Sequence, residues 1–285
     1  MDLIGAVALV AIATNFGLNQ VVVKVSNGGF QPVFMATLRS IGGGVVLLLW
    51  MRARGISISL PRASMFGGVI AGLLFALEFS FLFTALDLTT VSRSSIIFYS
   101  MPVWLALAAH VLLPGERLSG VRLVGFALAM SGVIVALADR ESGQASLWGD
   151  VLSLLAAFCW AGIALLVRVT PLSAVPAEQQ LLWQLLISAP LLFVMSLIYG
   201  PLIRELDVIH VAGLIYQIFA IASFGFLAWF WLMKIYPASS VASFSFLSPV
   251  FSVLLGWLIL GEQIAVSIWM ALALVASGLY LINRR

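Results

Sequence analysis

The chain has 285 residues, of which 63% are hydrophobic and 9% are charged, and its formal net charge is +3. Soluble domains are about a quarter charged, because their surfaces must stay in water, so this composition excludes a soluble protein. The 14 basic residues lie mostly at the ends of apolar runs, which is typical of membrane topology and argues against nucleic-acid binding.

Ten apolar runs follow one another, each of roughly 20 residues, which is enough to cross about 30 Å of hydrocarbon in a lipid bilayer. They predict an all-α integral membrane protein with transmembrane helices at 3–23, 31–51, 65–86, 92–113, 119–138, 147–168, 177–199, 208–233, 237–260 and 265–282. The connections are short and leave no room for a soluble domain. The first run begins at Leu3, with no basic segment before it and no small-residue cleavage site, so we expect it to stay as a helix.

The two halves of the chain carry similar stretches. Residues 102–116 read PVWLALAAHVLLPGE and residues 249–262 read PVFSVLLGWLILGE, and SGVIVAL and SGLYLIN follow later in each half. The match aligns Pro102, Glu116 and Gly132 with Pro249, Glu262 and Gly278. It predicts two repeats of five helices, at 1–140 and 145–285. Because five is odd, the second repeat must be inverted, and inverted repeats build transporters with a solute site near the bilayer midplane.

Ten spans place both termini on one side of the membrane. That side carries nine basic residues, Arg52, Arg54, Arg62, Arg117, Arg122, Arg168, Lys234, Arg284 and Arg285. The other side carries four, Lys24, Arg93, Arg140 and Arg204. The positive-inside rule therefore predicts a multi-pass protein of the cell (inner) membrane with cytoplasmic N- and C-termini.

Pro-Val in the fourth span, Gly-Glu after it and Ser-Gly in the fifth resemble EamA-type members of the drug/metabolite transporter superfamily, over essentially the whole chain. Three segments are most similar to YddG-type amino-acid exporters: TNFGLNQVVVKV (14–25), ATLRS (36–40) and FSFLFTALDLTTVSRSSIIFYSMPVW (79–104). The resemblance implies a monomeric basket of ten helices, in which helices 5 and 10 are peripheral and helices 1, 3, 4, 6, 8 and 9 line a cavity. It also implies export of amino acids, aromatic and other neutral ones included.

Glu78 lies well inside the third span, in LLFALEFSFLF. A carboxyl group at this depth is costly and normally faces protein or water. It could receive a substrate ammonium group or a coupling proton. It could equally be a neutral acid hydrogen-bonded between helices, or lie on an aqueous cavity without binding anything.

Asn15 and Asn19 stand one turn apart in the first span and share a helix face. Amides at this depth either hydrogen-bond to another helix or present donors and acceptors to a solute. Both interpretations stay open, and we include the two residues among the candidates for the cavity.

Tyr99 and Trp160 lie deeper in their spans than most aromatic residues of the chain. Aromatic side chains in membrane proteins are usually interfacial. If these two face a cavity, they would provide apolar walls suited to amino-acid side chains or other amphipathic solutes.

Arg39 is the only basic residue well within a predicted span, and we expect it to have a structural or topological role. A partner such as Glu78 would neutralise it, or its side chain could extend toward an interface. One arginine is little for a phosphorylated solute, which would need several cations.

Pro102 and Pro249 fall in the middle of their spans, where a proline removes a backbone hydrogen bond and bends the helix. Bending could serve gating, or it could be a static kink that shapes the cavity. Glu116 and Glu262 lie at helix ends, where a carboxylate favours a helix N-terminus, so we interpret them as capping residues.

Small residues at Gly68 and Gly72, and again at Gly125 and Ala129, predict close helix packing. No catalytic, nucleotide or metal motif is present in the sequence, so we expect no cofactor, no metal and no enzyme activity. The sequence therefore predicts a secondary transporter that exports amino acids or similar small metabolites by alternating access. The alternatives are an uncoupled channel-like facilitator, an exporter of other metabolites or drug-like amines, and a membrane protein that transports nothing.

Overall fold

The computed structural model describes residues 2–113, 119–139, 146–236, 244 and 246–283. Within these ranges, eight helices are long and apolar enough to cross a membrane, and the apolar helices Leu247–Leu260 and Val266–Ile282 are shorter. The all-helical fold of two inverted five-helix repeats is therefore confirmed.

The helices match the predicted spans to within a few residues at each end, except at the start of the ninth span, predicted at 237–260, where residues 237–243 and 245 lie outside the described residues and the helix begins at Leu247. In chain order they are α1 (Leu3–Ser26), α2 (Pro32–Ala53), α3 (Arg62–Leu88), α4 (Val91–Phe98), α5 (Met101–Leu112), α6 (Gly120–Ala138), α7 (Leu147–Val169), the short η1 (Pro171–Ala174), α8 (Ala177–Ser196), α9 (Val208–Tyr216), η2 (Gln217–Ser223), α10 (Phe224–Ile235), α12 (Leu247–Leu260) and α13 (Val266–Asn283). Polar residues begin many of them, because a side-chain oxygen accepts a bond from an unpaired N–H of the first turn, as Thr90 and Ser146 do.

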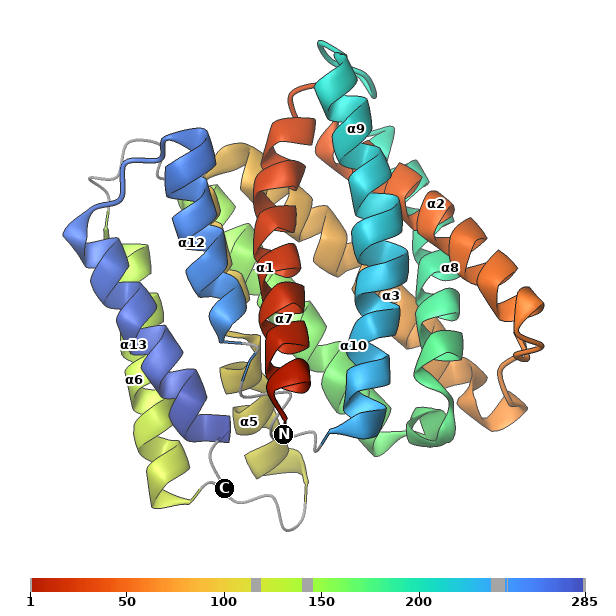
Figure 1. Ribbon diagram of the computed structural model, residues 1–285, viewed down its shortest axis with the longest axis horizontal. Coiled ribbons are helices and arrows are strands. Elements are labelled where there is room, and N and C mark those ends of the chain that lie inside the picture. Colours follow the sequence, from red (N-terminus) through yellow and green to blue (C-terminus); the bar gives the residue numbers. More distant parts are fainter. Residues whose placement is uncertain (1, 114–118, 140–145, 237–243, 245, 284–285) are drawn as a thin grey trace.

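α1 begins and α13 ends at the lower end of the bundle in Figure 1. We refer to this end as the terminal end and to the other as the opposite end. α3 ends and α4 begins at the opposite end, and α7 begins there as well.

The fourth span is broken into α4 and α5. α4 ends at Phe98 and α5 begins at Met101, so Pro102 falls in the first turn of α5, where its missing N–H removes no helical hydrogen bond. Ser100 helps to hold the break, because its hydroxyl accepts a hydrogen bond from the Trp104 indole at 2.9 Å. Tyr99 lies at this break between the two helices.

The eighth span is interrupted by a π-helix, η2, which the sequence did not predict. A π-helix leaves backbone carbonyls without the usual partners, and it is often found at functional positions. Asn15 of α1 donates to the carbonyl oxygen of Ala220 at 2.8 Å, and Ser223 donates to that of Ile218 at 2.8 Å. These side chains thus bind some of the backbone carbonyl oxygens that regular helical hydrogen bonds would otherwise satisfy.

α6 and α13 lie against each other at one edge of the bundle (Figure 1). Their backbones approach so closely that a Cβ atom at Gly278 would lie 2.5 Å from the backbone of Gly125, and one at Gly132 would lie 2.7 Å from that of Ala271. The repeated Ser-Gly pair therefore serves helix packing. On α3, a Cβ atom at Gly72 would lie 2.6 Å from the side chain of Ile187 of α8, so the predicted packing role of both small-residue pairs is confirmed.

Candidate functional site

A cavity of about 300 Å³ lies within the bundle. Its polar lining residues are Asn19, Gln20, Arg39, Glu78, Tyr99, Gln180, Gln184 and Ser248. Pockets for small molecules are lined mainly by apolar groups with a few polar groups that orient the ligand, and this cavity has that character. Among the described residues, none of the lining comes from α6 or α13. The lining does include α2 and α8, the second and seventh spans, which the resemblance did not imply.

The cavity extends toward the terminal end of the bundle. There the lining includes Val167, in the last turn of α7, and Ala177, the first residue of α8. Toward the opposite end, the lining reaches only Gln20, Leu82 and Phe98. It stops before the last residues of α1 and α3.

Aromatic rings form much of the wall. The aromatic lining residues are Phe16, Phe75, Phe79, Phe98, Tyr99, Trp160, Phe226 and Trp229. On one side Trp160 stacks on Phe98, with ring centroids 5.0 Å apart, and contacts Tyr99 edge-on at 6.1 Å. On another, Phe16 contacts Phe226 at 5.9 Å and Trp229 at 6.3 Å. The cavity therefore offers apolar, π-rich surfaces from both repeats.

Four of the five predicted cavity residues line this space: Asn19, Glu78, Tyr99 and Trp160. Glu78 is 4% exposed, on the cavity face of α3. The side-chain oxygens of Asn19 and of its neighbour Gln20 are buried and have no hydrogen-bond partner among the described residues. Tyr99 lines the cavity together with Gln20 and Ser248.

Asn15 occupies a different place. Its amide donates to Ala220 of η2, and its side-chain oxygen accepts a bond of 2.6 Å from the Tyr216 hydroxyl. These bonds hold α1 against the eighth span, so Asn15 supports the cavity wall from behind and is not among the lining residues.

Arg39 lines the cavity as well, which the sequence did not lead us to expect. It is 2% exposed, and its guanidinium carbon lies 3.9 Å from the ring centroid of Phe79. Its Nε and Nη1 atoms have no hydrogen-bond partner in the described part of the chain. Residue type and depth were visible in the sequence, but the direction in which α2 presents this side chain was not.

Pro102 and Pro249 both stand beside the cavity. Pro102 follows the break that places Phe98 and Tyr99 in the wall. Pro249 lies in the first turn of α12, next to Ser248, and most of the chain before α12 lies outside the described residues. A gating role for either proline stays a prediction.

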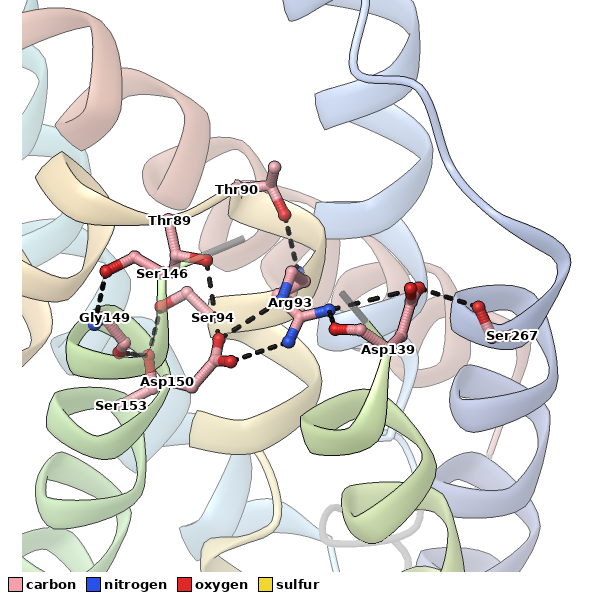
Figure 2. Close-up of polar contacts among 10 residues, drawn as sticks. All are labelled: Thr89, Thr90, Arg93, Ser94, Asp139, Ser146, Gly149, Asp150, Ser153 and Ser267. Carbon is pink, nitrogen blue, oxygen red and sulfur yellow. Dashed lines mark hydrogen bonds and ion pairs between the residues drawn. The ribbon is translucent and has the colours of Figure 1, made fainter. Parts of the chain in front are cut away.

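At the opposite end lies a buried ionic cluster, the Arg93 cluster, made of Thr89, Arg93, Asp139, Asp150 and Ser267 (Figure 2). Arg93 is fully buried and binds both carboxylate oxygens of Asp150, with Nη2 2.6 Å from Oδ2 and Nε 3.2 Å from Oδ1. Its Nη1 donates to the carbonyl oxygen of Asp139 at 2.7 Å. The cluster joins α4 and α6 of the first repeat to α7 and α13 of the second. Arg93, counted above with the basic residues of that side, is thus a buried ionic group.

Glu262 links the two repeats at the same end by capping a helix of the other repeat. Its carboxylate accepts bonds from the backbone N–H groups of Val91, at 2.6 Å, and Ser92, at 3.0 Å, and from the Ser92 hydroxyl at 2.6 Å. A carboxylate at a helix N-terminus is stabilised by the unpaired N–H groups and the helix dipole. The predicted capping role of Glu262 is confirmed, although the capped helix is α4. Glu116 lies outside the described residues.

Two more basic side chains fasten this end. Lys24 donates to the carbonyl oxygens of Leu86, at 2.9 Å, and Thr89, at 2.7 Å, at the end of α3. Arg204 makes two bonds, of 2.8 and 2.9 Å, to the Asp87 carboxylate, and these bonds raise the pKa of Arg204 above its usual range. Polar contacts thus join the helices across the opposite end, while the cavity extends toward the terminal end.

No group of three or more His, Cys, Asp or Glu side chains suited to a metal ion is found among the described residues. The polar groups of the cavity are amides, one carboxyl, one guanidinium and hydroxyls. They suit hydrogen bonding and charge pairing with a small solute.

The sequence matches the EamA-like transporter family twice, over residues 3–138 and 147–284. It is 29% identical to a "Probable amino-acid metabolite efflux pump" of Escherichia coli, covering 97% of this chain and 93% of that protein. It is 24% identical to the "Uncharacterized transporter YoaV" of Bacillus subtilis, with 96% and 94% covered, and 31% identical to protein PA1977 of Pseudomonas aeruginosa, with 98% and 93% covered.

The fold is similar to that of a solved protein structure. That structure is 22% identical, superposes with a TM-score of 0.69, and covers 98% of this chain and 96% of its own. Two family matches, one on each repeat, lead to the same conclusion as the apolar helices of the described residues and the cavity between them: the chain is a multi-pass membrane protein that belongs to the EamA-like transporter family.

Proposed function

We propose that this transporter exports amino acids, aromatic and other neutral ones, or similar small metabolites, by alternating access. In this proposal it works as a monomer in the cell inner membrane, with both termini in the cytoplasm. The observation that carries the proposal is the position of Glu78, a buried carboxyl group beside the aromatic wall of Phe98, Tyr99 and Trp160. A carboxylate suits an ammonium group, and the rings suit an apolar or aromatic side chain.

Two further facts support it. The Escherichia coli relative is named for amino-acid metabolite efflux. The cavity also extends toward the terminal end, while the Arg93 cluster and Glu262 hold the opposite end together. With cytoplasmic termini, this arrangement is the state in which an exporter takes up its solute.

The test is counterflow in proteoliposomes with a panel of amino acids, amines and drug-like cations. We expect labelled phenylalanine or another neutral amino acid to exchange, and the Glu78→Gln variant to exchange it more slowly. If amines or other metabolites move while amino acids do not, the proposed substrate class is wrong and the family assignment is unaffected.

A second candidate is an uncoupled facilitator of organic amines, because a single carboxyl group among aromatic rings also suits a cation without a carboxylate. Uptake with and without a pH gradient separates coupling from facilitation. An unchanged rate would argue for a facilitator, and a Glu78→Gln variant that keeps its gradient dependence would remove Glu78 from coupling.

A further inference from the structure

The side chain of Arg39 is buried at the cavity in a way that its surroundings do not explain. It is 2% exposed, yet Nε and Nη1 find no hydrogen-bond acceptor among the residues that the structure describes. Buried polar groups in native proteins are nearly always hydrogen-bonded, and a group that is not needs an explanation. An ionisable side chain inside a membrane protein is by default a candidate for function.

Aromatic contacts compensate only part of this burial. The guanidinium lies over the ring of Phe79, 3.9 Å from its centroid, and 5.5 Å from that of Phe83. A guanidinium that stacks on a ring by its face keeps its N–H groups in its own plane, where they can still donate to a planar acceptor. The rings therefore position the group and leave its hydrogen-bonding capacity for something else.

Groups of the opposite character line the same cavity. The side-chain oxygens of Asn19 and Gln20 are acceptors without a partner in the described ranges, and Glu78 supplies a carboxyl group. Arg39 and Glu78 are near enough to interact electrostatically. The cavity thus contains the cationic donors of Arg39 and the amide and carboxyl oxygens of Asn19, Gln20 and Glu78 within the same small volume.

We propose that Arg39 is the carboxylate-binding residue of this cavity, and that the solute is a zwitterion whose ammonium group is bound by Glu78 with the amide oxygens of Asn19 and Gln20. Arginine presents N–H groups in a fork that matches the two oxygens of a carboxylate. A phosphate ester fits less well, because its double negative charge would meet the Glu78 carboxyl and find one arginine.

This inference rests on the proposed function and makes it more specific. An amine facilitator would need Glu78 and the aromatic wall but not Arg39. An amino-acid exporter with this cavity would need both charged side chains, because each binds one end of the solute.

The experiment is a cycle of ligand and protein changes, measured as Kd by tryptophan fluorescence and as counterflow in proteoliposomes. The ligands are phenylalanine, phenylalaninamide and phenethylamine, and the proteins are the wild type, Arg39→Gln and Arg39→Lys. In the wild type we expect phenylalanine to bind at least about tenfold more tightly than phenethylamine, since its carboxylate adds hydrogen bonds to a charged group. In Arg39→Gln this preference should disappear while the affinity for phenethylamine stays within about twofold. Arg39→Lys should fall between the two, because it keeps the charge and loses the fork.

The matched control is Arg204→Gln, which removes a guanidinium at the opposite end, outside the cavity lining. It should keep the wild-type preference. If Arg39→Gln weakens phenylalanine and phenethylamine equally, Arg39 has a structural role and the proposal fails.

If Arg39→Gln does not fold, measurements on the wild type alone still test the proposal. Equal affinity for phenylalanine and phenylalaninamide would overturn the carboxylate site. If the wild type exchanges amino acids but Arg39→Gln keeps the preference for the carboxylate, only this inference fails. If the wild type exchanges phenethylamine and no amino acid, the proposed function fails with it.

Discussion

Arg39 and Arg93 are two buried arginines with opposite surroundings. Arg93, at 0% exposure, binds both oxygens of the Asp150 carboxylate and the Asp139 carbonyl. Arg39, at 2% exposure, stacks on Phe79, and two of its nitrogens have no hydrogen-bond partner in the part of the chain that is described. Burial alone therefore says nothing about the role of an arginine in a membrane. What distinguishes the two is whether the protein itself uses their donors.

The same contrast separates the two ends of the bundle. At the opposite end, the polar contacts of Arg93, Glu262 and Lys24 join helices that belong to different parts of the chain. Toward the terminal end, polar groups line a cavity. We infer that the first set holds one end closed and that the second set meets the solute.

The largest expected effect is the loss of Arg93. Arg93→Met leaves the buried Asp150 carboxylate without its cation, and breaking a buried ion pair in this way costs about 3–5 kcal/mol of unfolding free energy. Thermal and denaturant unfolding in detergent micelles measure it. The double variant Arg93→Met, Asp150→Leu should recover most of the loss, because no unpaired charge remains at Asp150. A single variant as stable as the wild type would show that the cluster does not hold the two repeats together.

A smaller effect is expected at the cap of α4. Glu262→Ala removes three hydrogen bonds to Val91 and Ser92 and should cost about 2 kcal/mol, near the upper end for a helix cap. Ser92→Ala removes one of the three and should cost about 1 kcal/mol. The control is Glu205→Ala, at an exposed carboxylate before α9, which should change stability by no more than about 0.5 kcal/mol. Equal losses in Glu262→Ala and Glu205→Ala would contradict a capping role.

Arg39→Met should behave differently from Arg93→Met. Removal of a buried cation whose donors are not used by the described residues should leave the unfolding free energy within about 1 kcal/mol of the wild-type value, or raise it. The same unfolding assays give the comparison directly. A loss as large as that of Arg93→Met would mean that both arginines are structural, and the contrast between them would disappear.

The smallest effect belongs to the pair of Arg204 and Asp87. Their side chains are 36% and 24% exposed, so water and salt screen the interaction. Asp87→Asn should cost about 0.2–1 kcal/mol at low salt and less at high salt. Unfolding of the wild type and Asp87→Asn at two salt concentrations tests this. A loss independent of salt would show that the pair acts as a buried one.

Much of the site was predictable from depth and residue type. Glu78, Asn19, Tyr99 and Trp160 were selected because each is polar or aromatic far inside an apolar span, and all of them line the cavity. Asn15 satisfied the same criterion but hydrogen-bonds to the eighth span instead. Asn15 and Asn19 lie on one face of α1, so the sequence cannot tell which of them lines the cavity. Asn15 binds the π-helix of the eighth span instead, and that π-helix has no sequence signal.

Arg39 and Gln20 were not predicted as lining residues, and Arg93 was counted as part of the topology signal. A hydropathy analysis treats Gln20, Arg39 and Arg93 simply as polar residues within or near apolar spans. It gives no information about what their side chains contact. The partner of Arg93 lies 57 residues away, on another helix. Such pairs depend on how helices rotate and pack against one another, and local patterns do not contain that information.

Run length, hydropathy, the repeated motif and the odd number of helices in each repeat are enough to predict the membrane environment, the ten spans, the repeat and its inversion. The sequence also indicated a break near Pro102, since a proline is not tolerated in the interior of a regular helix, and the structure begins α5 at that point. Only the tertiary structure decided which buried charges are paired, which repeat Glu262 caps, and which side chains share one cavity. Those depend on contacts between distant helices, where the rotation of a helix about its axis determines whether a side chain meets protein, lipid or solute.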